Sequence, residues 1–173
     1  MYPKLNPKVF ENLSYGLYIV TSLNEDRMNG QIINTAMQVT ADPPRVAVVI
    51  NKKNLTHEYI STSKVFAVLV LDEEAPLTFF GPFGFRSGRD VDKLANVKFK
   101  KGITGCPLIT DYTLSVLEAK VLDELDVGTH TIFVGDVVNG EVLKEGKPLT
   151  YRYYREHLKG KASQNSPTYT PTQ

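Results

Sequence analysis

The sequence has 173 residues, of which 42% are hydrophobic and 23% charged, with one cysteine and a formal net charge of +1. A chain of this length can bury roughly 70% of the surface that it exposes when unfolded, so one domain with a full core is expected. Twenty basic against 19 acidic residues give no global charge for holding nucleic acid or an anionic membrane. The single cysteine excludes an internal disulfide, a cysteine zinc site and a four-thiolate iron site, and no apolar leader or membrane-spanning run is visible. We therefore expect a cytoplasmic protein.

In the first half of the chain, short apolar blocks bounded by turn residues predict strands. Residues 17–22 and 31–40 flank a polar loop and are expected to pair as a hairpin. After a proline-containing break at 42–44, residues 45–51 and 64–71 are nearly continuous apolar blocks. Blocks of this kind are typical of strands that are buried on both faces.

Later in the chain, residues 113–125 and 129–140 predict two long strands. Asn139-Gly140 is a dipeptide that favours a type I′ turn, so we expect the second strand to end there. Helices are expected only as short pieces, at residues 7–13, 54–63, 75–80 and 87–94.

About seven strands with little helix, and no alternation of strands and helices, predict a mainly β fold, a closed barrel instead of a doubly wound sheet. From residue 159 onward the sequence is small, polar and proline-containing. We therefore expect a domain over residues 1–158 and an extended tail over 159–173. Tyr169 could fold across a pocket, or the tail could be disordered.

Local metal and nucleophile motifs are absent from the sequence. The three histidines, His57, His130 and His157, lie in different segments with no metal-ligand spacing, so no metal site is expected. Cys106 precedes a proline with no base nearby in sequence, and a small, semi-buried apolar role is the better interpretation.

Two segments instead carry the chemistry of a phosphate site. Where the strand at 45–51 ends and a short helix begins, lysine charge and free helix amides favour an anion; the residues are Asn51, Lys52, Lys53, Asn54 and Thr56. The second segment, at residues 81–93, joins glycines to basic and hydroxyl side chains, namely Arg86, Ser87, Arg89 and Lys93. Both segments are equally compatible with ordinary solvated surface.

Two further positions are suited to a polar heterocycle. Asn34-Thr35-Ala36 interrupts a strand with small polar residues, which either meet a flat ligand edge or form a solvent-facing row. His130 follows a glycine turn at the mouth of a strand, where it either faces a pocket or bonds to local backbone.

In combination, these segments resemble the flavin reductase-like family with the FMN-binding split-barrel fold. The resemblance rests on the ordered series SYGLYIVTS, NGQIINTAMQVTADPPRVAVVINKKNLTHEYI, GFRSGRDVDKL, GTHTIFVGDV and PLTYRYY, over about residues 10–155. The nearest subgroup contains flavoredoxin-like proteins and the flavin domain of high-molecular-weight rubredoxins. The fold that this resemblance implies is a Greek-key split β-barrel with a few short helices.

The resemblance implies noncovalent FMN near a homodimer interface. Its implied isoalloxazine contacts are Gln31, Asn34, Thr35, Ala36 and Gln38, and its implied phosphate and ribityl contacts are Asn51, Lys53, Asn54, Thr56, Arg86, Ser87 and Lys93. His130 matches the family histidine on the nicotinamide side, although Thr129 stands where many relatives have Asp.

The function implied is an FMN-binding oxidoreductase, either an NAD(P)H-dependent flavin reductase or a reductase that passes electrons to a small redox protein. With one cysteine in the sequence, a rubredoxin-like acceptor is expected to be a separate molecule. A non-enzymatic FMN-binding electron carrier and a ligand-free split-barrel interaction module are the alternatives.

Overall fold

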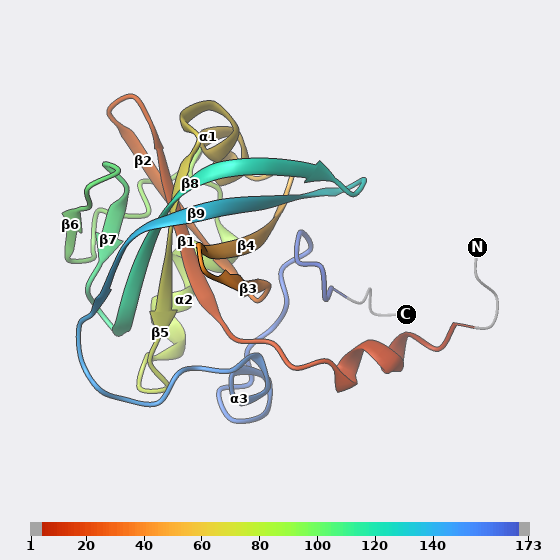
Figure 1. Cartoon of the computed structure of the whole chain (residues 1–173). Coiled ribbons are helices and arrows are strands. Elements are labelled where there is room, and N and C mark those ends of the chain that lie inside the picture. The colour runs from red at the N-terminus through yellow and green to blue at the C-terminus, as the bar shows by residue number, and fades with distance from the viewer. Residues whose placement is uncertain (1–4, 170–173) are drawn as a thin grey trace.

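The computed structural model describes residues 5–169 (Figure 1). Within them, one seven-stranded antiparallel sheet has the order β2-β1-β5-β8-β9-β4-β3. Its strands are β1 (Tyr18–Asn24), β2 (Arg27–Ile33), β3 (Ala36–Ala41), β4 (Pro44–Asn51), β5 (Val65–Leu71), β8 (Thr113–Asp126) and β9 (His130–Val142). A small second sheet pairs β6 (Phe99–Lys101) with β7 (Pro107–Ile109). The helices are a 3₁₀ helix η1 (Pro7–Asn12), α1 (Leu55–Ser63), α2 (Leu77–Phe85) and α3 (Tyr151–Glu156).

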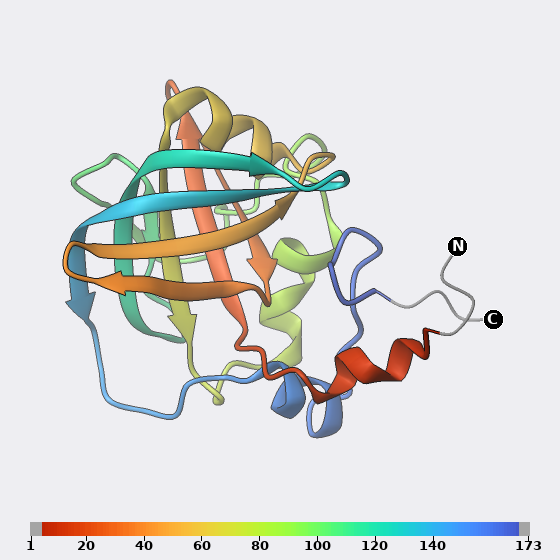
Figure 2. The ribbon, with the colours of Figure 1, turned by 45° about the vertical axis from the view of Figure 1, so that its right-hand side comes forward.

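The large sheet curls round on itself into a barrel, and α2 and α3 lie outside it near the N-terminal segment and the C-terminal tail (Figure 2). Side chains alternate between two cores because successive residues of a strand point to opposite faces. On β1 and β5, Val20 and Val68 belong to the core inside the barrel, whereas Ile19 and Leu69 belong to the core under α2 and α3. Both faces of these strands are therefore covered, which explains their nearly continuous apolar sequence.

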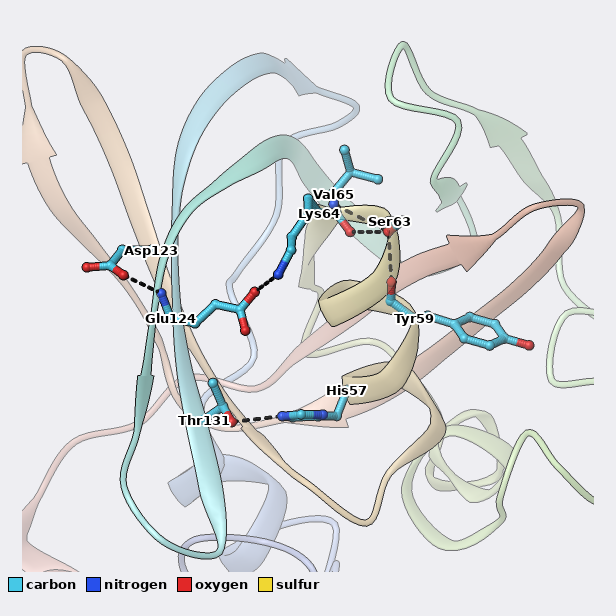
Figure 3. A network of polar contacts seen from close by, with 8 residues as sticks. All are labelled: His57, Tyr59, Ser63, Lys64, Val65, Asp123, Glu124 and Thr131. Carbon is cyan, nitrogen blue, oxygen red and sulfur yellow. Dashed lines mark hydrogen bonds and ion pairs between the residues drawn. The ribbon is translucent and has the colours of Figure 1, made fainter.

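Polar contacts fasten α1 to the β8–β9 hairpin (Figure 3). The Nε2 atom of His57 lies 2.8 Å from the Thr131 hydroxyl, and the His57 ring centroid lies 5.2 Å from that of Phe133. At the other end of the helix, Lys64 forms an ion pair with Glu124. Burial lowers the pKa of His57 from its ordinary value. These contacts hold the start of α1 in a fixed position beside β9.

Most of the expected strands are confirmed, namely those at 17–22, 45–51, 64–71, 113–125 and 129–140. The strand expected over 31–40 is instead divided. Residues up to Ile33 pair with β1, whereas residues from Ala36 pair with β4. Asn34 and Thr35 form the crossing between them, and the Thr35 carbonyl accepts from the amide of Val49. The hairpin partner of β1 is therefore β2, which begins earlier than expected, at Arg27.

The turn predicted at Asn139-Gly140 is wrong. Pairing of β9 with β8 continues through Gly140 to Val142, and neither residue of the dipeptide has the positive φ that a type I′ turn requires. The Asn139 side chain donates to the carboxylate of Glu118, 2.9 Å away. Long-range strand pairing thus outweighs the local turn preference.

The helix predicted at 87–94 is also wrong, since this stretch forms turns. The Ser87 hydroxyl accepts from the Arg89 amide, and the Asp92 carboxylate accepts from the Leu94 amide. Such local side-chain acceptors compete with helical hydrogen bonding. Neither α3 nor the β6–β7 pair is expected from the sequence.

No helix among residues 5–169 is both long enough and apolar enough to cross a membrane.

Candidate functional site

A narrow cavity lies between β2, the end of β4, α2, α3 and the tail. It encloses about 50 Å³. Four residues expected to contact the flavin line it, and they come from two separate parts of the chain: Gln31, Asn34, Asn51 and Asn54. The tail closes the cavity with residues that include Lys161, Ala162, Ser163, Asn165, Ser166 and Pro167.

Gln31 is the most informative side chain in this cavity. It lies on β2 and is only 7% exposed. Its Oε1 atom is buried and has no hydrogen-bond partner, and it is the sole such side-chain atom found among residues 5–169. A buried acceptor without a partner costs free energy, so this oxygen is suited to a ligand that brings a donor.

The three asparagines that line the cavity direct their polar atoms at the tail. Asn34 Nδ2 donates to the Thr168 hydroxyl at 2.7 Å, and Asn51 Nδ2 donates to the Asn165 carbonyl at 3.3 Å. Asn54 stands at the N-cap of α1 but makes no side-chain cap. Its Oδ1 instead accepts from Asn165 Nδ2 at 2.8 Å. Asn54 Oδ1 thus bonds to Asn165, which lies over the cavity, and not to an amide in the first turn of α1, as an N-cap side chain usually does.

His130 reaches the same place from the start of β9. Its Nε2 lies 3.1 Å from the Asn165 carbonyl oxygen, and its Nδ1 lies 2.8 Å from the Thr129 hydroxyl. Since a carbonyl oxygen only accepts, the proton of this contact belongs to Nε2. The Thr129 hydroxyl can then donate to Nδ1 and fix the orientation of the ring. His130 and Asn51 are therefore two donors directed at one oxygen atom.

The apolar wall of the cavity is aromatic. Phe80 and Phe85 come from α2, and Tyr151 and Tyr154 from α3. The Phe80 and Tyr154 rings meet edge to face with centroids 5.4 Å apart, and those of Tyr151 and Tyr154 stack at 6.3 Å. Rigid rings on one side and amide groups on the other are typical of a site for a flat, polar-edged ligand.

Other residues expected to contact the isoalloxazine lie beside the cavity and are not among its lining. The Thr35 hydroxyl donates to Asn34 Oδ1 at 3.0 Å, so it orients a lining side chain. Ala36 begins β3 and packs against the core inside the barrel. Gln38 is exposed on β3, and its Nε2 donates to the Thr40 carbonyl.

The residues expected to hold phosphate are distributed around the start of α1. Thr56 is fully buried, and its hydroxyl accepts from Asn29 Nδ2. Lys53 is exposed, and its amide donates to Asn51 Oδ1 at 3.0 Å. Arg86 is exposed at the end of α2, and Ser87 follows it with its hydroxyl bonded to an amide.

Three basic residues from the two segments expected to hold phosphate have different partners. Lys52 pairs with Asp126 at 2.5 Å, and Arg89 pairs with Glu58 at 2.9 Å. Lys93 is buried and donates to the Gly30 carbonyl at 2.9 Å. In the structure these three cations are thus engaged by three separate groups and do not meet at one point.

Sequence reasoning did not identify the aromatic wall or the groups of the tail that lie over the cavity. The wall comes partly from the PLTYRYY segment, whose tyrosine spacing of three residues is the signal for one helix face. The role of Asn165 and Thr168 has no local sequence signal, because their asparagine partners Asn34 and Asn54 are more than 100 residues away along the chain. Cys106, by contrast, is fully buried, and burial raises the pKa of its thiol to about 12, which suits an unreactive core residue.

Comparison with known proteins agrees with the fold. Residues 10–161 match the flavin reductase like domain. The chain is 46% identical over 166 residues to a high molecular weight rubredoxin of Moorella thermoacetica, covering 96% of this chain and 72% of that protein. It is also 46% identical over 165 residues to a ferric-chelate reductase (NAD(P)H) of Archaeoglobus fulgidus, covering 95% of this chain and 98% of that one.

Solved structures show the same architecture. The flavin reductase HpaC complexed with NADP+ superposes with a TM-score of 0.72 at 28% identity, covering 83% of this chain and 89% of that one. An FMN-binding protein from Thermus thermophilus superposes with a TM-score of 0.69 at 26% identity, covering 78% and 75%. The mainly β split-barrel expectation is thereby confirmed. The chain belongs to the flavin reductase-like domain family, a flavin-binding family, and is a flavin reductase-like oxidoreductase.

Proposed function

We propose that the chain binds FMN noncovalently in this cavity and acts as an NAD(P)H-dependent reductase that passes electrons to a separate acceptor. Support comes from the names of similar proteins, one an FMN-binding protein and one a ferric-chelate reductase (NAD(P)H). The single observation that carries the proposal is the unpartnered Gln31 oxygen in a cavity with an aromatic wall.

Gln31 and Asn34 fit the polar edge of an isoalloxazine. That edge carries an N–H donor between two carbonyl acceptors, so it can satisfy an unpartnered acceptor and an amide donor together. Gln31 Oε1 would accept from the ring N–H, and Asn34 Nδ2 would donate to a ring carbonyl. The rings of Tyr151, Tyr154 and Phe85 would cover its apolar surface.

The other end of the site fits a ribityl chain and its phosphate. Asn51 and Asn54 lie where β4 ends and α1 begins, and α1 has no side-chain cap at its N-terminus. The first amides of a helix of this length favour an anion, and exposed Lys53 adds charge beside them. Thr56 acts indirectly, since its buried hydroxyl holds the first turn of α1 against Asn29.

When bound, the flavin supplies two-electron chemistry between a nicotinamide donor and an acceptor. The chain's own residues bind and orient it, and the aromatic wall excludes water from one side of the cavity. His130 presents an Nε2–H donor at the mouth of the site. It is suited to hold a polar group of the incoming nicotinamide, with Thr129 fixing its ring.

Homodimerisation is part of the proposal. Large apolar side chains stay more than 45% exposed on η1, on its flanks and on the edge strand β3: Leu5, Val9, Phe10, Leu13, Met37 and Val39. Exposed apolar groups in this number are typical of a surface that a partner covers. A rubredoxin-like acceptor would come from outside these 173 residues, since a sole cysteine cannot build a four-thiolate iron site.

Replacing Gln31 tests the ligand assignment. Gln31→Met keeps the length of the side chain and removes the acceptor, so FMN should bind roughly three- to tenfold more weakly. Because the oxygen has no partner in the protein, the same change should leave the midpoint of thermal unfolding equal or higher. Fluorescence titration with FMN and a melting curve measure the two. Unchanged FMN affinity in a folded variant would contradict the assignment.

Anaerobic titration of the FMN-loaded protein separates an enzyme from a carrier. Addition of NADH or NADPH should bleach the flavin band, and a rubredoxin or a ferric chelate should restore it. If neither nucleotide bleaches the band but dithionite does, the chain is an electron carrier and the reductase proposal fails.

A further inference from the structure

We propose that residues 161–168, here called the strap, are an internal competitor that occupies the flavin site and must leave before flavin binds. The strap takes up polar groups that the proposed function assigns to the cofactor, so this inference rests on that function. It concerns how the site opens to its ligand.

The chain is directed into the strap by a tight turn after α3. Lys159 has a positive φ of 55°, and the Gly160 amide donates to the Tyr154 carbonyl at 2.9 Å. A Cβ on Gly160 would lie 2.0 Å from the Tyr154 ring, so only glycine fits here. The Tyr154 hydroxyl then donates to the Lys161 carbonyl at 3.2 Å. Tyr154 thus fixes the start of the strap at the edge of the cavity.

Strap atoms complete hydrogen bonds with the site from three directions. The Asn165 carbonyl accepts from both Asn51 Nδ2 and His130 Nε2, and Asn165 Nδ2 donates to Asn54 Oδ1. The Thr168 hydroxyl accepts from Asn34 Nδ2. Four side chains assigned to the cofactor or to its electron donor are therefore already bonded to the chain's own tail.

The chemistry of these contacts is that of an oxygen-rich ligand. Donors of Asn34, Asn51 and His130 meet one hydroxyl and one carbonyl oxygen, the kinds of atom that a ribityl chain and a flavin ring present. Gln31 is the exception, because the strap supplies no donor to it. The strap thus imitates part of the ligand and leaves one acceptor unsatisfied for the ligand itself.

The volume of the cavity shows whether the strap competes with the flavin or covers a bound flavin. The cavity beneath the strap encloses about 50 Å³. Sites that bury a ligand of cofactor size enclose roughly 300–1,000 Å³. A flavin cannot be accommodated while the strap is seated, so the strap has to be displaced.

Displacement is inexpensive because the strap is held mostly by half-buried polar contacts and not by core packing. Gln164 and Pro167 are exposed, and the strap contributes no residue to either hydrophobic core. The apparent affinity of the site is reduced by the fraction of molecules in which the strap is seated. A variant whose strap is held less firmly should therefore bind flavin more tightly.

Substitutions in the full-length chain test this expectation. Asn165→Ala combined with Thr168→Ala removes the strap's side-chain contacts with Asn34, Asn54 and Tyr151 and changes no residue outside the strap. The dissociation constant for FMN, measured by fluorescence quenching, should fall roughly tenfold, with a faster association rate. Gln164→Ala, an exposed neighbour, is the matched control and should bind as the unchanged chain does. Equal or weaker binding by the double variant would overturn the competitor role.

Hydrogen exchange gives a readout that does not depend on activity. The Ser166 amide donates within the strap to the Ser163 carbonyl, and the Tyr169 amide, just after the strap, donates to the Ser166 carbonyl. FMN should make amides over 163–169 exchange faster, because the strap leaves. Slower exchange with FMN would mean that the segment closes over the flavin, which overturns the proposal. If neither chain binds FMN at all, the proposed function fails and the competitor role with it; if both bind FMN alike, the competitor role alone fails.

Discussion

Lys93 is a charged residue in an unusual setting. It is 7% exposed, and its ammonium donates to the carbonyl of Gly30, the residue before Gln31. Burial lowers the pKa of Lys93 to about 8, because water no longer solvates the charge. The Lys93 side chain thus holds β2 in place beside Gln31. Burial of its charge lowers the free energy of unfolding.

We predict that this cost depends on pH. In the unfolded chain the pKa is near 10.5, so between about 8 and 10.5 the unfolded state binds more protons and the free energy of unfolding rises with pH. Lys93→Met removes this contribution, which is on the order of 3 kcal/mol. Urea unfolding of both chains at several pH values should show the variant's relative stability falling from pH 8 to 10. A constant difference over that range would show that Lys93 carries no depressed pKa.

At the scale of elements, Glu118 connects β8 with β9 and with the turn between β6 and β7. From β8, its fully buried carboxylate accepts from the Ile103 amide, the Thr104 amide and hydroxyl, and Asn139 Nδ2 on β9. Burial by itself would raise the pKa of Glu118, but these hydrogen bonds outweigh it and the pKa lies below its ordinary value. The turn between β6 and β7 is thereby attached to the barrel.

Glu118→Gln should destabilise the protein by about 1–3 kcal/mol at pH 7, because an amide offers one acceptor where the carboxylate offers two. A depressed pKa contributes stability that is present above the ordinary value of 4.5 and is lost as pH falls through the folded value. The difference in free energy of unfolding between the unchanged protein and Glu118→Gln, measured by urea unfolding, should therefore become smaller below pH 4.5. Equal stability at neutral pH would refute this role of Glu118.

At the scale of the whole molecule, the sequence predicts strands better than it predicts their connections. Continuous apolar blocks such as 45–51 and 64–71 are recognisable because both of their faces are buried. Asn139-Gly140 was misleading because its outcome depends on a distant partner, Glu118, and residues 87–94 because the Ser87 and Asp92 side chains accept from nearby amides and compete with helical hydrogen bonding. Local patterns do not report such distant partners.

In the site too, some residues could be named from the sequence and others could not. Gln31, Asn34, Asn51 and Asn54 could be named from the sequence and do line one cavity. The groups that lie over them, Asn165 and Thr168, come from a polar tail with no periodic signal, and only folding places them there. That these four residues and the others named from the sequence contact FMN remains a prediction.

The central claim is that this cavity takes FMN, and direct binding to the full-length chain tests it. The purified protein is mixed with excess FMN, freed of unbound flavin by gel filtration, and examined for flavin absorbance and protein concentration. The account predicts a yellow protein with one FMN per chain, and a lower FMN content for Gln31→Met. A colourless protein that also leaves the fluorescence of added FMN unquenched would contradict it.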